Sequence, residues 1–204
     1  MGKTATIKVG VLLAVLVLIP LLASLNVALV SADPGKMTWT IVDTPSSEGN
    51  VVVPGSEINA MAIGVDGMTF YAADTPNMKL YKSTDGGVTW EDISERLFSA
   101  AGGAVHIWNV VMAPDDINFV VVVTDSSVVG PKRVLISKDG GQNWEGVDAG
   151  LTLDPNEFIG CLDVSFKYGQ YRDIAIGTRN GSAGGKVLVS QAEVIAPSWR
   201  DQNL

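Results

Sequence analysis

The strongest constraint on the fold is a short motif that occurs twice. Residues 83–90 read STDGGVTW and residues 137–144 read SKDGGQNW, so both copies share the pattern Ser-x-Asp-Gly-Gly-x-x-Trp. A motif that recurs within one chain indicates a repeated structural unit, and its spacing then measures the length of that unit.

The spacing of the tryptophans extends the repeat beyond the two motifs. Trp39, Trp90, Trp144 and Trp199 are separated by 51, 54 and 55 residues, by subtraction of their numbers. A period near 50 is typical of β-propeller blades and is too long for helical repeats of about 34 residues.

Four runs with strand composition recur in the same order within each period. They are rich in Val, Ile, Phe and Tyr and are bounded by Gly, Pro, Asp and Asn. The first runs are 57–65, 104–113 and 157–166, the second 68–73, 118–124 and 172–178, the third 78–83, 132–137 and 186–190, and the fourth begin near Trp90, Trp144 and Trp199. No segment outside the apolar N-terminal stretch shows a convincing helical period. The prediction is an all-β chain of four-stranded antiparallel meanders, with blades at about 57–97, 104–151 and 157–204.

The predicted ring is incomplete, with about three blades where propellers have about four to eight. Met37–Asp43 is expected to be a lone fourth strand, placed beside the third strand of the last blade. The third unit is degenerate, because Ser190-Gln-Ala192 lacks the aspartate and both glycines, and extra residues including Pro197 precede Trp199. Either the chain is a fragment of a longer one, which we favour, or two or more copies complete the ring as a homo-oligomer.

The N-terminal segment predicts export. Residues 9–30 contain no charged side chain, follow Lys3 and Lys8, and end just before Ser31-Ala32. Residues 1–32 therefore read as a signal peptide cleaved after Ala32. The alternative is an uncleaved membrane anchor through residues 9–30. Propeller blades would occupy residues 37–204, and the product would be secreted, periplasmic or at the cell surface.

Charge and cysteine content exclude some classes. The formal net charge is −8, which argues against nucleic acid and anionic membranes as partners, since both require basic patches. The single cysteine, Cys161, allows no intrachain disulfide and is expected to be a small buried core residue. No cofactor is indicated.

The repeated motif resembles the Asp-box, or bacterial neuraminidase repeat. The resemblance covers Trp39 to the C-terminus and implies propellers of the sortilin, photosystem II assembly factor or sialidase type. In such a hairpin turn, aspartate accepts main-chain hydrogen bonds, glycines take positive φ angles and tryptophan buries its ring. We therefore assign a structural role to Ser83, Asp85, Gly87, Trp90, Ser137, Asp139, Gly141 and Trp144. Catalytic or calcium-binding roles for the two aspartates are disfavoured, because equivalent turns do not converge.

Topology directs the search for a ligand site to the opposite face. In a four-stranded meander the repeated turns share one end with the first-to-second-strand turns. The other end receives the residues that follow each second strand and those that begin each first strand. The candidate ligand-binding residues there are Asp74, Asp125, Arg179, Glu57, His106 and Trp108. The competing interpretation is that the two aspartates only cap turns and that His106 is hydrogen-bonded packing. No residue is assigned to catalysis or to a metal.

Three functions fit these features. The first is an exported, non-catalytic binding module that recognises protein or carbohydrate, as an assembly factor or adhesin would. The second, implied by the resemblance, is a sialidase-like or cellulase-like glycoside hydrolase whose catalytic residues lie largely outside this chain. It is disfavoured because the arginines do not recur at matching positions and because Tyr168 and Tyr171 fall at the repeated-turn end. The third is an envelope component anchored through residues 9–30.

Overall fold

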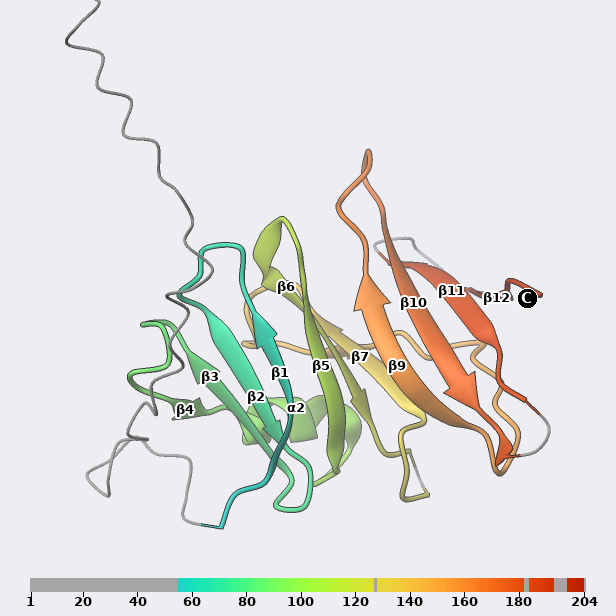
Figure 1. Cartoon of the computed structure of the whole chain (residues 1–204), viewed down its shortest axis with the longest axis horizontal. Helices are drawn as coiled ribbons and strands as arrows, with labels where there is room; N and C mark the ends of the chain where they lie inside the picture. The colour runs from blue at the N-terminus through green and yellow to red at the C-terminus, as the bar shows by residue number, and fades with distance from the viewer. Residues whose placement is uncertain (1–54, 127, 182–183, 193–197, 204) are drawn as a thin grey trace, which may run out of the picture. The chain divides into compact units, whose positions relative to one another are not determined.

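The computed structural model describes residues 55–126, 128–181, 184–192 and 198–203 (Figure 1). All of them belong to one compact unit, Asp43–Leu204. The predicted signal or anchor segment at 1–32 and the predicted lone strand at 37–43 lie outside the described residues. Within the described part of the chain, no helix has the length and apolar character needed to cross a membrane.

The described residues form three four-stranded antiparallel sheets, each a meander in which consecutive strands pair. The first sheet contains β1 (Ile58–Ile63), β2 (Phe70–Asp74), β3 (Lys79–Ser83) and β4 (Glu91–Asp92). The second contains β5 (Ile107–Ala113), β6 (Asp116–Thr124), β7 (Arg133–Ser137) and β8 (Glu145–Gly146). The third contains β9 (Phe158–Val164), β10 (Arg172–Arg179), β11 (Val187–Ala192) and β12 (Trp199–Asp201). This confirms the all-β prediction of propeller blades, about three in number.

The sheets are neighbours through their first strands. β1 contacts β5, and β5 contacts β9, so these three strands form the inner series and β4, β8 and β12 lie at the opposite sheet edges (Figure 1). This is the order that a propeller requires, in which first strands line the centre and fourth strands lie at the rim.

One detail of the predicted strand arrangement is wrong. The position beside β11 was expected for Met37–Asp43, but β12 occupies it, with Leu188 opposite Asp201 and Ser190 opposite Trp199. The physical reason is that the chain returns to β11 after the degenerate turn, so the third blade supplies its own fourth strand. Most of that turn, residues 193–197, lies outside the described residues.

A short helix, α2 (Ser94–Ala101), was not expected. It follows β4 and ends at Gly102, which has a positive φ of 87° and donates its N–H to Phe98 O. Leu97 is completely buried in the core between the first two blades. Eight residues are too few for a clear hydrophobic period, and helices this short depend on tertiary packing more than on propensity.

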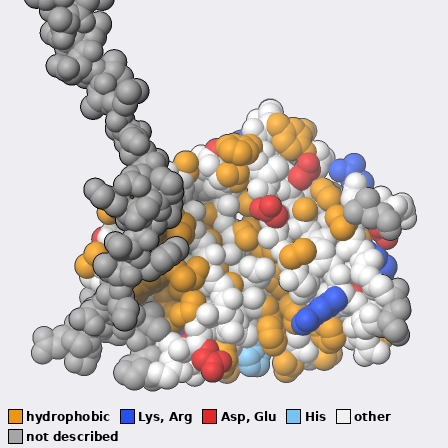
Figure 2. Space-filling model, in the orientation of Figure 1, with side chains coloured by type: hydrophobic (Ala, Val, Ile, Leu, Met, Phe, Trp, Pro, Cys, Tyr) orange, Lys and Arg blue, Asp and Glu red, His pale blue; other side chains and the backbone are white. Residues whose placement is uncertain are grey.

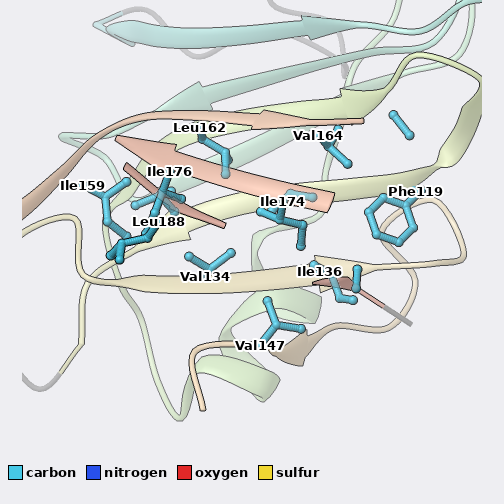
Figure 3. Close-up of a cluster of buried hydrophobic side chains, with 14 residues drawn as sticks. Phe119, Val134, Ile136, Val147, Ile159, Leu162, Val164, Ile174, Ile176 and Leu188 are labelled. Atoms are coloured by element: carbon cyan, nitrogen blue, oxygen red, sulfur yellow. The ribbon is translucent and has the colours of Figure 1, made fainter. Parts of the chain in front are cut away.

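The cores lie between neighbouring sheets. β6 supplies both, because successive side chains of a strand point to opposite faces: Val120 and Val122 pack toward the first blade, and Val121 and Val123 toward the third. Figure 3 shows the second of these clusters, in which Ile174 and Ile176 of β10 lie opposite Val134 and Ile136 of β7. A strand buried on both faces explains the continuous valine run.

Each first strand carries a β-bulge within its first three residues. In every blade, the pairing of the first strand with the second advances by two residues on the first strand and by one residue on the second. One residue of the first strand is therefore left without a cross-strand partner. The extra residues, between Ile58 and Ala60, between Ile107 and Asn109, and between Ile159 and Cys161, are Asn59, Trp108 and Gly160.

The third bulge explains why the prediction for Cys161 is wrong. Ile159 and Leu162 both face the core, although they are three residues apart, because Gly160 is the extra residue. Strict alternation from Ile159 would bury Cys161, whereas the bulge turns it to the other face, where it is exposed.

Candidate functional site

The two repeated turns share the hydrogen bonds made by their serine and aspartate side chains. In the first, Ser83 Oγ donates to Asp85 Oδ1 at 2.8 Å and accepts from Gly87 N at 2.9 Å. The Asp85 carboxylate also accepts from the main chain of Thr89 at 2.9 Å and from its hydroxyl at 2.6 Å. Trp90 Nε1 closes the turn by donating to Gly87 O at 3.0 Å.

The second turn repeats the serine and aspartate bonds with one substitution, but Trp144 Nε1, unlike Trp90 Nε1, is buried without a hydrogen bond to the described residues. Asn143 takes the place of Thr89 and donates to the Asp139 carboxylate from its main chain at 2.8 Å and from Nδ2 at 2.7 Å. These donors, led by the Thr89 and Asn143 side chains, lower the pKa of Asp85 and of Asp139 to about 2. Carboxylates so strongly stabilised as anions act as turn supports, and they are poorly suited to proton transfer near neutral pH.

Main-chain bonds place both turns at the end of the sheets where β1 joins β2. Gly86 N donates to Met68 O and Gly140 N donates to Asn118 O, each at 2.9 Å. Hydrophobic side chains also gather at this end, near the top of the view in Figure 2, and the exposed ones include Phe166 and Tyr168 before β10.

At the opposite end, Asp125 brings three predicted residues together. Its Oδ2 accepts from the main chain of His106 at 3.0 Å and contacts His106 Nδ1 at 2.6 Å. Its Oδ1 accepts from Trp108 Nε1 at 2.8 Å and from Gly130 N at 2.7 Å. Asp125, His106 and Trp108 therefore form one cluster at the start of β5 and the end of β6.

The electrostatics of the cluster fix the histidine tautomer. Burial acts to raise the pKa of Asp125, but hydrogen bonds from Gly130, Trp108 and His106 outweigh it, so the pKa is lowered. An ionised carboxylate only accepts hydrogen bonds, so Nδ1 of His106 carries the proton. Nε2 is the ring nitrogen that Asp125 leaves for a ligand or for solvent.

The cluster borders a hollow between the first two blades. We call it the inter-blade hollow; its volume is about 340 Å³, and it is lined by Asn59, Thr75, Pro76, His106 and Trp108. The indole of Trp108 and the ring of His106 lie 5.9 Å apart between centroids. Thr75 joins the two blades, since its hydroxyl donates to Ile107 O at 2.6 Å.

The structure does not bring the other predicted residues into this cluster. Asp74 is buried and accepts from Asn77 N at 3.2 Å and from Asn77 Nδ2, so it holds the β2–β3 turn. Arg179 is exposed at the end of β10, opposite Phe158. Glu57 is exposed before β1 and does not line the inter-blade hollow.

Sequence reasoning missed three residues of the hollow: Asn59, Thr75 and Pro76. Asn59 is the bulge residue of β1 and occupies the position that Trp108 takes in β5. Its Oδ1 accepts from Thr75 N at 3.2 Å, which leaves its amide N–H groups for other partners. Aligning the blades on their bulges, rather than on the ends of the runs, is the signal that would have identified this residue.

The corresponding end of the third blade is built differently. Glu157 is completely buried and accepts from the Thr178 hydroxyl at 2.6 Å and from Lys186 Nζ at 2.9 Å. Burial acts to raise its pKa, but Thr178, Lys186 and the Asp154 amide outweigh it, so the pKa is lowered. Among the described residues, no three His, Cys, Asp or Glu side chains lie close enough together to share a metal ion.

Comparisons with known proteins identify no family. No protein-family model matches the chain, and no curated protein matches it significantly. Among solved structures, a GH74 xyloglucanase from Xanthomonas campestris is 17% identical, covering 72% of this chain and 22% of its own, with a TM-score of 0.46. Saccharomyces cerevisiae Sqt1 is 14% identical, covering 72% and 34%, with a TM-score of 0.42. An ancestral GH74 enzyme is 13% identical, covering 71% and 25%, with a TM-score of 0.39.

The chain thus spans between about a fifth and a third of the length of these structures. At these TM-scores none of the likenesses bears on activity. The assignment of propeller blades rests on the three meanders themselves and on the order of their first strands.

Proposed function

We propose that this chain is an exported, non-catalytic binding module of the Asp-box propeller type, and that the inter-blade hollow is its ligand site for protein or carbohydrate. The observation that supports it most is the Asp125 cluster. One buried carboxylate fixes the ring orientations of both Trp108 and His106 at the wall of a hollow between two blades. Ligand sites commonly combine apolar ring surfaces with a few oriented polar groups on a rigid scaffold.

The groups that line the hollow suit recognition. Trp108 and Pro76 offer apolar surface, while the amide of Asn59 and Nε2 of His106 offer directional hydrogen bonds. Asp125, the carboxylate that contacts Trp108 and His106, has both oxygens engaged and a lowered pKa. It therefore cannot serve as the general acid that glycoside hydrolysis requires.

A binding screen tests the proposal. The full chain is applied to a glycan array and to an array of envelope-protein peptides, together with Trp108→Ala and Asp85→Asn variants. Binding that is lost in Trp108→Ala and retained in Asp85→Asn supports the hollow as the site. Absence of binding on both arrays, or binding that follows the Asp85 variant, contradicts the proposal.

The alternative is a glycoside hydrolase with catalytic residues largely outside this chain. Incubation of the full chain, and of any longer natural form, with chromogenic sialosides and β-glucans distinguishes the two proposals. Turnover by either form would replace the binding-module proposal with the hydrolase one.

Two further parts of the proposal have their own measurements. Export with loss of residues 1–32 predicts a mature N-terminus at Asp33, and retention predicts an intact chain in the detergent fraction; N-terminal sequencing separates them. Completion of the ring by a second copy predicts a homo-oligomer by light scattering, whereas a ring completed by further blades predicts a longer natural polypeptide.

A further inference from the structure

Lysine occupies a half-buried position of the first blade whose equivalent in the second blade is a core position. Cross-strand pairing aligns three pairs of residues on the sheet face directed toward the next blade: Tyr71 with Lys82, Val121 with Ile136, and Ala175 with Val189. Val121 and Ile136 are buried in the second core. Placing an ammonium group where its equivalent is isoleucine costs desolvation free energy, so this exception to the repeat needs a reason.

The contacts of Lys82 leave its charge without a counterion. Nζ donates to Gly140 O at 2.7 Å and lies 5.6 Å from the centroid of the Tyr71 ring. Burial lowers the pKa of Lys82, although the charge of Glu91 acts against this effect. The structure gives Lys82 no ion pair within the described residues. Glu91, directly opposite on β4, accepts instead from Arg96 Nη2 at 2.5 Å.

Two more polar atoms nearby lack partners in the described part of the protein. The hydroxyl of Tyr71, a completely buried residue, and Nη1 of Arg96 are both buried without a hydrogen bond. Tyr71 and Lys82 converge on Gly140, where a Cβ atom would lie 3.0 Å from Lys82 Nζ and 3.7 Å from the Tyr71 hydroxyl. Unpaired buried donors are costly and rare, so their presence here calls for an explanation.

Lys82 also lines a hollow at the repeated-turn end, which we call the turn-side hollow. Its volume is about 360 Å³, and its wall consists of Lys82, Thr84, Thr89, Trp90, Glu91 and Gln142. Residues from the first and second repeated turns therefore contribute to it jointly. Trp90 uses its indole N–H within its own turn, so it offers the hollow ring surface only.

We propose that the turn-side hollow binds a carboxylate group of a compact ligand, with Lys82 as its counterion and Trp90 as the wall for the rest of the molecule. The carboxylate supplies the negative charge that Lys82 lacks, since Glu91 is paired with Arg96 and the carboxylate of Asp139 is held by its own turn. This site is independent of the inter-blade hollow. The two hollows lie at opposite ends of the sheets. An experiment that disproves ligand binding at one of them therefore leaves the proposal for the other unaffected.

Calorimetric titration of the full chain with small carboxylates tests the proposal. Glucuronate and N-acetylglutamate represent a sugar acid and a peptide-type acid, and glucose is the uncharged match to the first. Saturable binding of at least one acid, without binding of glucose, is expected. Lys82→Ile installs the residue that the second blade has at this position, and it should weaken binding by roughly 10- to 100-fold, the usual cost of losing a charged hydrogen-bond partner.

Lys138→Ala provides the matched control, because Lys138 lies in the second turn and is already paired with Glu145 at 2.6 Å. It should bind as the unaltered chain does. Unfolding by urea establishes that Lys82→Ile is folded, and its stability should equal or exceed that of the unaltered chain. Three outcomes would overturn the proposal: no saturable binding of either acid, equal binding of glucose, or unchanged acid binding by a folded Lys82→Ile variant.

Discussion

Replacing Asp125 by alanine should destabilise the protein more than replacing any other aspartate that follows or ends a second strand. Its side chain is 8% exposed and accepts hydrogen bonds from His106, Trp108 and Gly130. Truncation leaves the buried Gly130 N–H unpaired, at about 1–3 kcal/mol, and three partly buried donors, His106 N, His106 Nδ1 and Trp108 Nε1, at about 1 kcal/mol each. The expected loss in unfolding free energy is therefore about 4–6 kcal/mol.

Asp74→Ala is the matched comparison, because Asp74 is equally buried but receives its hydrogen bonds from one residue, Asn77. Its loss should cost only about 1–2 kcal/mol. Equilibrium unfolding in urea measures both values. In a double-mutant cycle, Asp125→Ala should lower the unfolding free energy less in the Trp108→Phe background than in the unaltered chain, since the indole donor is then absent.

The pH dependence gives a second measurement of the same cluster. The folded pKa of Asp125 is lowered, so its contribution is fully present above the pKa of the unfolded chain and is lost as pH falls through the folded pKa. The free-energy difference between the unaltered chain and Asp125→Ala should therefore narrow in acid. The reasoning is refuted if Asp125→Ala costs no more than Asp74→Ala at pH 7, or if the cycle shows no coupling to Trp108.

Three other changes have defined outcomes. Asp139→Ala should lower the melting temperature at pH 7. The difference in melting temperature between the unaltered chain and this variant should disappear as pH falls from 3.8 toward about 2, because the pKa of Asp139 is depressed in the folded protein. Thermal unfolding at several pH values checks this. Gly141→Ala should destabilise by about 1–3 kcal/mol in urea unfolding, because φ is +86° and the new Cβ would lie 2.9 Å from Ile93 Cδ1. Trp199→Phe removes the hydrogen bond from Nε1 to Val147 O at 2.9 Å between the last two blades, and should cost about 1 kcal/mol in the same assay.

Controls separate these effects from general damage. Gly150→Ala has a similar φ of +77° but open space around the new Cβ, so it should cost less than Gly141→Ala. Equal costs would mean that crowding by Ile93 is unimportant. A pH-independent difference for Asp139→Ala, or an unchanged unfolding free energy for Trp199→Phe, would contradict the corresponding hydrogen-bond assignment.

The blades could be predicted from sequence because tryptophan, glycine and aspartate recur at turns, where local backbone chemistry selects them. His106, Trp108 and Asp125 could be placed at one end because a meander alternates its turns between two ends. Their contact could not be predicted, because it depends on the bulge at Trp108, and a bulge becomes visible only in the cross-strand register.

The same limit explains the other differences. Cys161 is predicted in the core as a small residue of an apolar run, but the bulge at Gly160 turns it to the exposed face. Helix α2 spans only eight residues, of which Ser94 and Leu97 are buried, so it presents too few positions for a clear hydrophobic period. The polar pair of Tyr71 and Lys82 was concealed because lysine in a strand normally indicates a solvent-facing position, whereas here its stem crosses the interface to reach Gly140 O.

The bulges at Asn59, Trp108 and Gly160 have a consequence for how such a protein can diversify. Each is the extra residue of its strand, outside the regular pairing that fixes strand register, and two of them already present an amide and an indole to one hollow. Exchange of the side chain at residues 59 and 160 can alter what the surface recognises while the valine-rich layers beneath remain unchanged, whereas Trp108 also packs against the core and bonds to Asp125. A randomised library restricted to residues 59 and 160 would therefore sample new specificities beside a constant Trp108.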